Sequence, residues 1–196
     1  MGNNILAIQG MNGTLTSSDL LISAELNGII TTTTDNLPFA NDMALLDGLR
    51  VTELMYHASA GSNFDYIELQ NIGDTTLDLT GVRLSDGINF AFPAMALEAG
   101  RYVVVVSNTA SFRSTYGTGI NVAGEYSGNL SNGGEKVVLS LPWPLDAAIL
   151  RFEYSDTWYP ATDGNGSSLA INDPLANPAG WNESVNWHAT TPSPGG

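Results

Sequence analysis

The stretch that decides the fold is Asp65-Tyr66-Ile67-Glu68-Leu69-Gln70-Asn71. Ile67 and Leu69 fall on one face of an extended chain, while Tyr66 and Glu68 fall on the other. Apolar side chains that recur at every second position are typical of a strand with one face against a core. The stretch therefore predicts a half-buried β-strand.

Further strands are expected on both sides of this one. Short apolar runs alternate with turn-forming pairs such as Asp86-Gly87 and Ala99-Gly100, which supply the backbone conformations that hairpins require. The run from Tyr102 to Val106 does not alternate, so we expect both of its faces to be covered and place it at the centre of a sheet. Many short strands at this spacing indicate an all-β sandwich or barrel. The candidate strands span 49–56, 64–71, 76–84, 101–107, 136–141 and 147–154.

Outside the strands, the sequence indicates one short helix and an extended C-terminal segment. Residues 109–116 form the one convincing helix, because Asn108 is a suitable N-cap and Phe112 and Tyr116 lie four positions apart on one side. From Thr157 onward, tryptophans stand among Gly, Asn and Pro residues. This pattern predicts an extended tail that is held on the sandwich by aromatic side chains.

The first 48 residues are organised differently from the rest. Residues 1–31 hold two apolar runs separated by a loop rich in Gly, Asn and Ser, which predicts a β-hairpin-like extension that belongs to a preceding β-domain. Residues 32–48 contain turn formers without sustained periodicity and are predicted to be a linker. Residues 49–196 make the main domain. The abrupt hydrophobic start of the chain indicates a fragment of a larger parent protein.

Composition argues against several classes of function. A formal charge of −14 repels phosphate backbones and anionic lipid headgroups, so nucleic acid is not expected as a partner. Without cysteine there is no disulfide, no cysteine zinc site and no thiol nucleophile. No apolar run reaches the roughly 18 residues that a membrane helix needs, so membrane insertion is not expected. The length of 196 residues suits one full β-domain with a fragment rather than two large domains.

Residues 49–196 resemble bacterial lamin-tail domains through a series of motifs that occur in the same order. The resemblance implies an immunoglobulin-like β-sandwich, and it implies no catalytic residues and no cofactor. One departure is Pro142-Trp143-Pro144-Leu145, which stands where a shorter polar turn is usual. The motifs that carry the resemblance lie at 51–56, 65–71, 77–86, 100–104, 108–117 and 130–135, and then at Trp158, Pro160, 163–169, Asn177-Pro178, Trp181 and the final Pro-Gly.

The N-terminal segment has a resemblance of its own. The runs Asn4 to Asn12 and Ser17 to Leu26 are similar to the last strands of galactose-binding-like jelly-roll domains. Such strands, cut off from their own domain, would leave unpaired edges and an apolar face. We therefore expect residues 3–31 to dock on the main domain or to pair with a second copy in a homodimer.

The residue types that commonly perform catalysis form no recognisable signature. The serine-nucleophile, zinc-protease and phosphate-loop motifs are all missing from the sequence. His57 and His188 lie in different parts of the chain and are expected to be loop or packing residues, not a joint base or metal pair. We therefore expect a protein that is not an enzyme and that holds no catalytic or cofactor-binding residue.

Two glutamates lie within predicted strands. Glu53 is in phase with the apolar positions of its strand, so it is expected on the apolar face unless a bulge shifts the register. A buried carboxylate needs partners, and we expect Glu53 to accept backbone N–H bonds or to pair with Arg83 or Arg101. Glu68 faces away from Ile67 and is expected to be solvated or paired.

Aromatic residues raise the alternative of a glycan-stacking platform. Trp143 is flanked by prolines at a hairpin tip, so we expect it to be exposed and available to a ligand or partner. The structural interpretation is that the remaining aromatic residues anchor the core or the tail. The set comprises Trp143, Trp158, Tyr159, Trp181 and Trp187.

Together these patterns predict a non-enzymatic structural or protein-interaction module of a larger exported bacterial protein, located outside the cell or on its surface. Its partners would be another protein or the neighbouring domains of the parent chain. The alternatives are a glycan-binding or calcium-dependent adhesion module, and an accessory domain that positions a catalytic neighbour. The sequence leaves open whether a metal binds.

The run Asp163-Gly164-Asn165-Gly166-Ser167 generates the metal hypothesis, because its oxygen-bearing side chains alternate as at the start of a calcium loop. It lacks the distal bidentate glutamate of an EF-hand, and the other interpretation is a turn whose side chains bond their own backbone. If calcium binds here, thermal denaturation at millimolar calcium will show a raised melting temperature. An unchanged melting temperature would remove the calcium hypothesis.

Overall fold

The computed structural model describes residues 39–196. The predicted extension of residues 1–31, its docking or dimerisation, and the first part of the predicted linker lie outside the described residues. Within residues 39–196, no helix has both the length and the apolar character that crossing a membrane requires.

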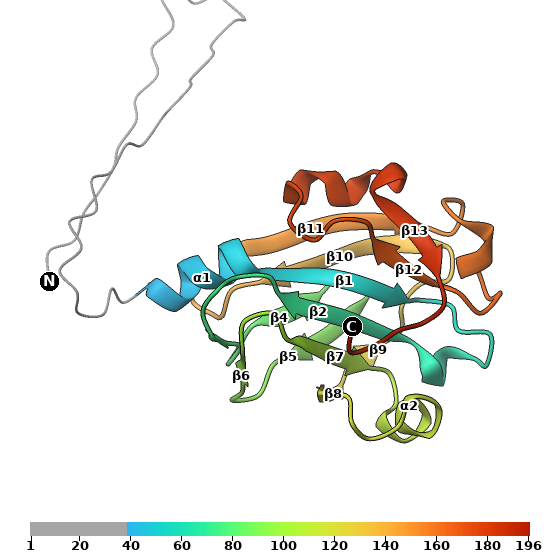
Figure 1. Ribbon diagram of the computed structural model, residues 1–196, viewed down its shortest axis with the longest axis horizontal. Helices are drawn as coiled ribbons and strands as arrows, with labels where there is room; N and C mark the ends of the chain where they lie inside the picture. The colour runs from blue at the N-terminus through green and yellow to red at the C-terminus, as the bar shows by residue number, and fades with distance from the viewer. Residues whose placement is uncertain (1–38) are drawn as a thin grey trace, which may run out of the picture. The chain divides into compact units, whose positions relative to one another are not determined.

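Two β-sheets pack face to face and make up most of the domain (Figure 1). The larger sheet has the order β13-β12-β1-β2-β7-β8, the smaller has the order β11-β10-β4-β5-β9, and β3 pairs with β6 separately. This arrangement confirms the predicted all-β sandwich. The elements are α1 Ala40–Gly48, β1 Leu49–Met55, η1 Ser62–Phe64, β2 Tyr66–Asn71, β3 Leu77–Asp78, β4 Arg83–Ser85, β5 Ile88–Ala91, β6 Ala96–Leu97, β7 Tyr102–Val106, α2 Thr109–Tyr116, β8 Val122–Glu125, β9 Ser127–Gly128, β10 Gly134–Ser140, β11 Ala148–Ser155, η2 Pro160–Thr162, β12 Ser168–Ile171, η3 Pro178–Asn182, η4 Ser184–Asn186 and β13 Trp187–Thr190.

The main core lies between the two sheets and follows the alternation of the strands. Ile67 and Leu69 of β2 point into it, while Tyr66 points to the opposite face. From the smaller sheet, Leu150 and Phe152 of β11 enter the same core. Side chains with a period of two are thus buried on the inner face of each sheet, as the sequence predicts.

Helix α2 covers part of the outer face of the larger sheet. Asn108 caps it, with its Oδ1 accepting a hydrogen bond from Ser111 N at 2.8 Å. Phe112 is fully buried and meets the ring of Tyr66 edge to face, with ring centroids 5.6 Å apart. A second, smaller hydrophobic cluster forms there, and it confirms the predicted helix, its cap and its buried face.

Strand β7 is the non-alternating valine run, and its environment corrects part of the prediction. Val103 and Val105 enter the main core, whereas Val104 and Val106 lie in the cluster under α2. Both faces are covered, as expected. The strand is not central, however, because it lies between β2 and β8, next to the edge of the larger sheet.

The single strand predicted over 76–84 is wrong, since a turn divides it into β3 and β4. Gly81 has φ of 77°, a conformation that strands do not use. Before it, Asp78 Oδ1 accepts hydrogen bonds from Thr80 N at 2.9 Å and Thr80 Oγ1 at 2.5 Å. This local bonding satisfies the backbone outside any sheet and turns the chain.

Helix α1 replaces part of the predicted linker, so the expectation of a single helix is also wrong. Its N-cap residue, Phe39, makes no side-chain capping bond. Its apolar residues also do not gather strongly on one face of the helix. The helix is fixed instead by packing, because Leu45 is fully buried in the main core and the helix contacts β3 and β11. Tertiary contacts of this kind override weak local signals.

The predicted extended tail adds two strands to the larger sheet. Strand β12 pairs antiparallel with β1, and β13 pairs with β12. The aromatic anchoring is confirmed: Trp181 and Trp187 are buried in the core, and the indole Nε1 of Trp181 donates to the carbonyl of Val51 at 3.0 Å. The last quarter of the chain is therefore part of the sandwich.

The Trp181 indole generates a prediction about stability. Replacing Trp181 with Phe removes its hydrogen bond to Val51 and leaves a small cavity, so we expect a loss of about 2–3 kcal/mol in the free energy of unfolding. Urea denaturation followed by circular dichroism measures it. The matched control is Trp143→Phe, whose side chain is 79% exposed and should change stability by less than about 0.5 kcal/mol. Equal stabilities for the two variants would contradict the anchoring role.

Candidate functional site

A β-bulge in β1 determines where Glu53 points. Val51 pairs with Leu69 of β2, and Glu53 pairs with Glu68, so Thr52 is an extra residue. The shift places Glu53 on the outer face, away from the main core. The sequence predicts Glu53 on the apolar face unless a bulge shifts the register, and this bulge does shift it. Both carboxylates are nonetheless only 3% exposed. Of the two alternatives expected for Glu68, the solvated one is wrong and the paired one is confirmed by the hydrogen bonds described next.

The last residues of the chain supply donors to this carboxylate pair. Glu53 Oε1 accepts hydrogen bonds from Tyr66 Oη at 2.6 Å and from Ser193 N at 3.1 Å. Glu68 Oε1 accepts from Thr52 Oγ1 at 2.6 Å, and its Oε2 accepts from Gly195 N at 2.6 Å. The predicted backbone N–H partners of Glu53 are confirmed. We call Glu53, Glu68 and the bound residues 193–196 the carboxylate anchor.

The predicted arginine partners of Glu53 are engaged elsewhere. Arg83 pairs with Asp146, and Arg101 Nε lies 3.9 Å from Glu98 Oε2. Both pairs lie at the surface, where guanidinium groups keep their hydration. The anchor thus holds its carboxylates with neutral hydroxyl and backbone N–H donors.

Burial raises the pKa of two carboxyls, one in β2 and one in the residue that precedes it. The pKa of Glu68 rises to about 7, chiefly because it is desolvated, while its bonds to Thr52 and Gly195 oppose the rise. Desolvation likewise raises the pKa of Asp65 to about 6, against the hydrogen bond that it accepts from Ala58 N. These groups bond the backbone of their own domain, so their perturbed pKa values have a structural cause.

The two histidines have separate partners. His57 Nδ1 lies 2.7 Å from Asp163 Oδ1, and His188 Nδ1 lies 2.7 Å from Asn172 Oδ1. Among residues 39–196, no group of three or more His, Cys, Asp or Glu side chains is arranged to hold a metal ion. His57 lies in the bend after β1, as expected of a loop residue, whereas His188 is an exposed residue of β13, so the expectation of a loop or packing residue is wrong for His188.

The loop that raised the calcium hypothesis is closed by its own bonds. Asn165 Nδ2 donates to the carbonyls of Pro160 at 2.8 Å and Asp163 at 3.0 Å. Gly164 and Gly166 have φ of 70° and 89°, which turns the chain sharply at each. These bonds are those of the local-turn interpretation, while calcium binding itself stays a prediction.

The aromatic residues do not form one platform. Trp181 and Trp187 are buried at 0% and 1% exposure, so the hypothesis of a five-membered stacking surface is wrong. Trp158 packs beside Trp187, and Tyr159 Oη donates to the carbonyl of Trp187 at 2.7 Å. Trp143 is exposed, as predicted.

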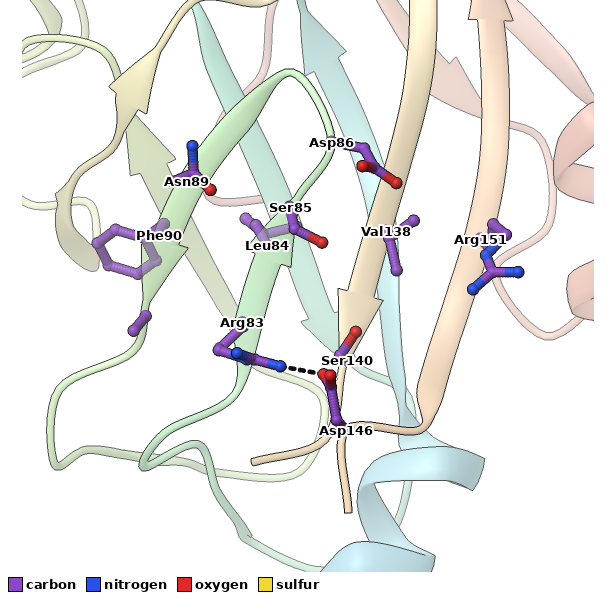
Figure 2. A pocket seen from close by; sticks show the side chains of 11 residues that line it. Arg83, Leu84, Ser85, Asp86, Asn89, Phe90, Val138, Ser140, Asp146 and Arg151 are labelled. Carbon is purple, nitrogen blue, oxygen red and sulfur yellow. Dashed lines mark hydrogen bonds and ion pairs between the residues drawn. The ribbon is translucent and has the colours of Figure 1, made fainter. Parts of the chain in front are cut away.

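A shallow groove lies on the outer face of the smaller sheet, and no pattern in the sequence predicts it. Short side chains of β4 and β10 form its floor, with Ser85 opposite Val138 and Ser140 opposite Arg83. Longer side chains rise around them (Figure 2), and the volume is about 560 Å³. Only the strand register reveals this arrangement, because the lining residues are spread from 83 to 151.

Ion pairs balance most of the charge around this groove. Arg83 of β4 bonds Asp146 of the β10–β11 loop, as the dashed line in Figure 2 shows. Lys136 Nζ lies 2.8 Å from Asp86 Oδ2 at the β4–β5 turn. Arg151 of β11 has no ion-pair partner within residues 39–196. The groove therefore presents donors and acceptors side by side.

Comparison with known proteins identifies a family. The family model described as the Lamin Tail Domain matches residues 46–155. This range begins in α1 and ends with β11, so it covers most strands of both sheets. No curated protein matches the chain.

The raised pKa of Glu68 generates a prediction of pH dependence. The folded chain binds this proton more tightly than the unfolded chain, whose glutamate has a pKa near 4.5. The stabilising contribution is therefore fully present below about pH 4.5 and is lost as the pH rises through about 7. In the wild type, Glu68 should lower the free energy of unfolding by about 3 kcal/mol between pH 5 and pH 8. In Glu68→Gln we expect this pH-dependent loss to be absent.

Urea denaturation at both pH values measures this difference. The glutamine amide can donate to Thr52 while its carbonyl accepts from Gly195, so the variant keeps the geometry of the anchor. The control is Glu98→Gln, which removes an equal charge from a side chain that is 76% exposed. A wild-type pH dependence in Glu68→Gln would show that this carboxyl does not control stability.

Proposed function

Since the chain belongs to the lamin tail domain family, we propose that it acts as a non-enzymatic structural or protein-interaction module of a larger exported protein. The lamin tail domain is a non-enzymatic, immunoglobulin-like module. Fold alone does not assign a function, so the proposal depends on what the surface of this chain offers to a partner.

The observation that carries the proposal is the difference between the two outer faces of the sandwich. The larger sheet is covered by α2 and by residues 193–196, which bond Glu53 and Glu68. Within residues 39–196, the smaller sheet carries no such cover over β4 and β10, and its groove is open. An interaction module needs one accessible, structured surface, and this face supplies it.

Two features of the sequence support export. The chain has no cysteine, so its folding is independent of the redox state of its compartment. Its charge of −14 favours solubility and discourages association with anionic polymers and membranes. An acidic surface rich in Thr, Asn and Gly fits a bacterial extracellular setting.

Site-specific photo-crosslinking tests the proposal. A photoreactive amino acid replaces Ser85, at the groove floor, in the whole protein within the cells that produce it. We expect a defined adduct with an extracellular protein or a neighbouring domain of the same chain. The matched control places the probe at Val185, which is 77% exposed and lies in η4.

Two outcomes would overturn the proposal. If the probe at Ser85 gives no adduct beyond those of the Val185 control, the open face is not a protein-interaction surface. Adducts with cytoplasmic proteins alone would contradict export.

A further inference from the structure

We propose that the groove on the outer face of the smaller sheet binds a neutral oligosaccharide, with Trp143 at one end as a stacking residue. The inference rests on the proposed function as an interaction module and assigns a surface and a ligand class to it. Four observations carry it: the shape of the groove, its hydrogen-bonding groups, its charge balance and the exposed tryptophan.

The shape fits a short sugar chain. A volume of about 560 Å³ lies within the range of small-ligand sites. Cross-strand pairs explain the depression, because Ser85, Val138 and Ser140 are short, whereas Arg83 and Arg151 in the same rows are long. The register of β4, β10 and β11 fixes these rows, so the floor is formed without any ligand.

The lining chemistry favours a ligand rich in hydroxyl groups. Guanidinium groups offer donors, Asp86 and Asp146 offer acceptors, and the hydroxyl of Ser85 and the amide of Asn89 offer both. In Figure 2 these groups come from β4, the β4–β5 turn, β5, β11 and the loop before β11. Vicinal sugar hydroxyls need adjacent donors and acceptors, whereas an apolar ligand would leave these groups desolvated and unpaired.

The balance of charge favours a neutral ligand over an anionic one. The two arginines of the lining are matched by two aspartates, and the chain as a whole carries −14. The bond from Asp146 holds Arg83 in place and neutralises it. Three of the six basic side chains of the protein lie on this face, and two of them are paired with aspartates, so within residues 39–196 a polyanion would meet only Arg151 as an unpaired cation here.

The loop between β10 and β11, which supplies Asp146 to the groove, also carries Trp143. Asp146 of this loop reaches the groove to bond Arg83, and Asp146 N donates to the carbonyl of Pro142 at 3.3 Å. Trp143 follows Pro142 directly and is 79% exposed. An exposed indole on the loop that borders a polar groove is suited to stacking on the C–H face of a sugar ring.

A peptide fits this surface less well than a sugar. Extended peptides gain affinity by pairing with a sheet edge, and here the edges of the smaller sheet are protected. Asn182 Oδ1 accepts from Glu153 N at 3.1 Å at the edge of β11, where η3 also packs, and the other edge strand, β9, has only two residues. The open face offers side chains alone.

Binding to an array of neutral and uronic-acid-containing oligosaccharides, followed by titration calorimetry of the strongest neutral probe, tests the inference. We expect saturable binding that falls by about tenfold or more in Trp143→Ala, since one stacking contact is lost. Ser85→Trp fills the floor and should abolish binding. Val185→Ala, an exposed apolar control, should bind as the wild type does. Melting temperatures verify that all variants are folded.

Other results of these experiments would overturn the inference, the proposed function or both. Absence of neutral-sugar binding at millimolar concentration, or binding that persists in both groove variants, overturns the inference. Binding restricted to uronic-acid probes or to an acidic peptide overturns the neutral-sugar assignment. If the array is blank while the Ser85 crosslinker captures a protein, the inference fails and the interaction module stands; if both fail, both proposals fall.

Discussion

The bulge in β1 is the constraint on which the outer layer of the domain depends. Side chains alternate along a strand, so a chain that buries Val51 would also bury the side chain two positions later. The extra residue Thr52 breaks this phase and moves Glu53 to the outside, opposite Glu68. Two neighbouring carboxylates then require donors, and the backbone of residues 193–196 meets this need. One inserted residue thus determines where residues 193–196 bind on the sheet.

The sandwich and helix α2 were predictable because their signals are local. The alternation of Ile67 and Leu69, the turn at Asp86-Gly87 and the cap at Asn108 each act within a few residues. Helix α1 was not predictable in this way, since Leu45 is held by distant parts of the core. The groove and the carboxylate anchor also escaped prediction. Their members meet only through strand register, which a single sequence does not reveal.

The two sheets differ in how their outer surfaces are used. The larger sheet carries a second hydrophobic cluster, so Tyr66 and Phe112 extend the core outward beneath α2. The smaller sheet has hydrophobic side chains on its inner face and a mainly polar outer face. Burial on both faces makes the larger sheet a stable support. A rigid larger sheet allows the outer face of the smaller sheet to keep its polar groups in fixed positions.

Pairing between β1 and β12 sets the order in which the domain can be completed. These neighbours, with Leu54 opposite Leu169, are separated by more than a hundred residues of sequence. During synthesis β1 and β2 are available early, but the second side of β1 stays an open sheet edge until residues 168–171 leave the ribosome. Such long-range closure is slow relative to hairpin formation. The emerging chain therefore carries an unprotected, aggregation-prone edge until β12 pairs with β1.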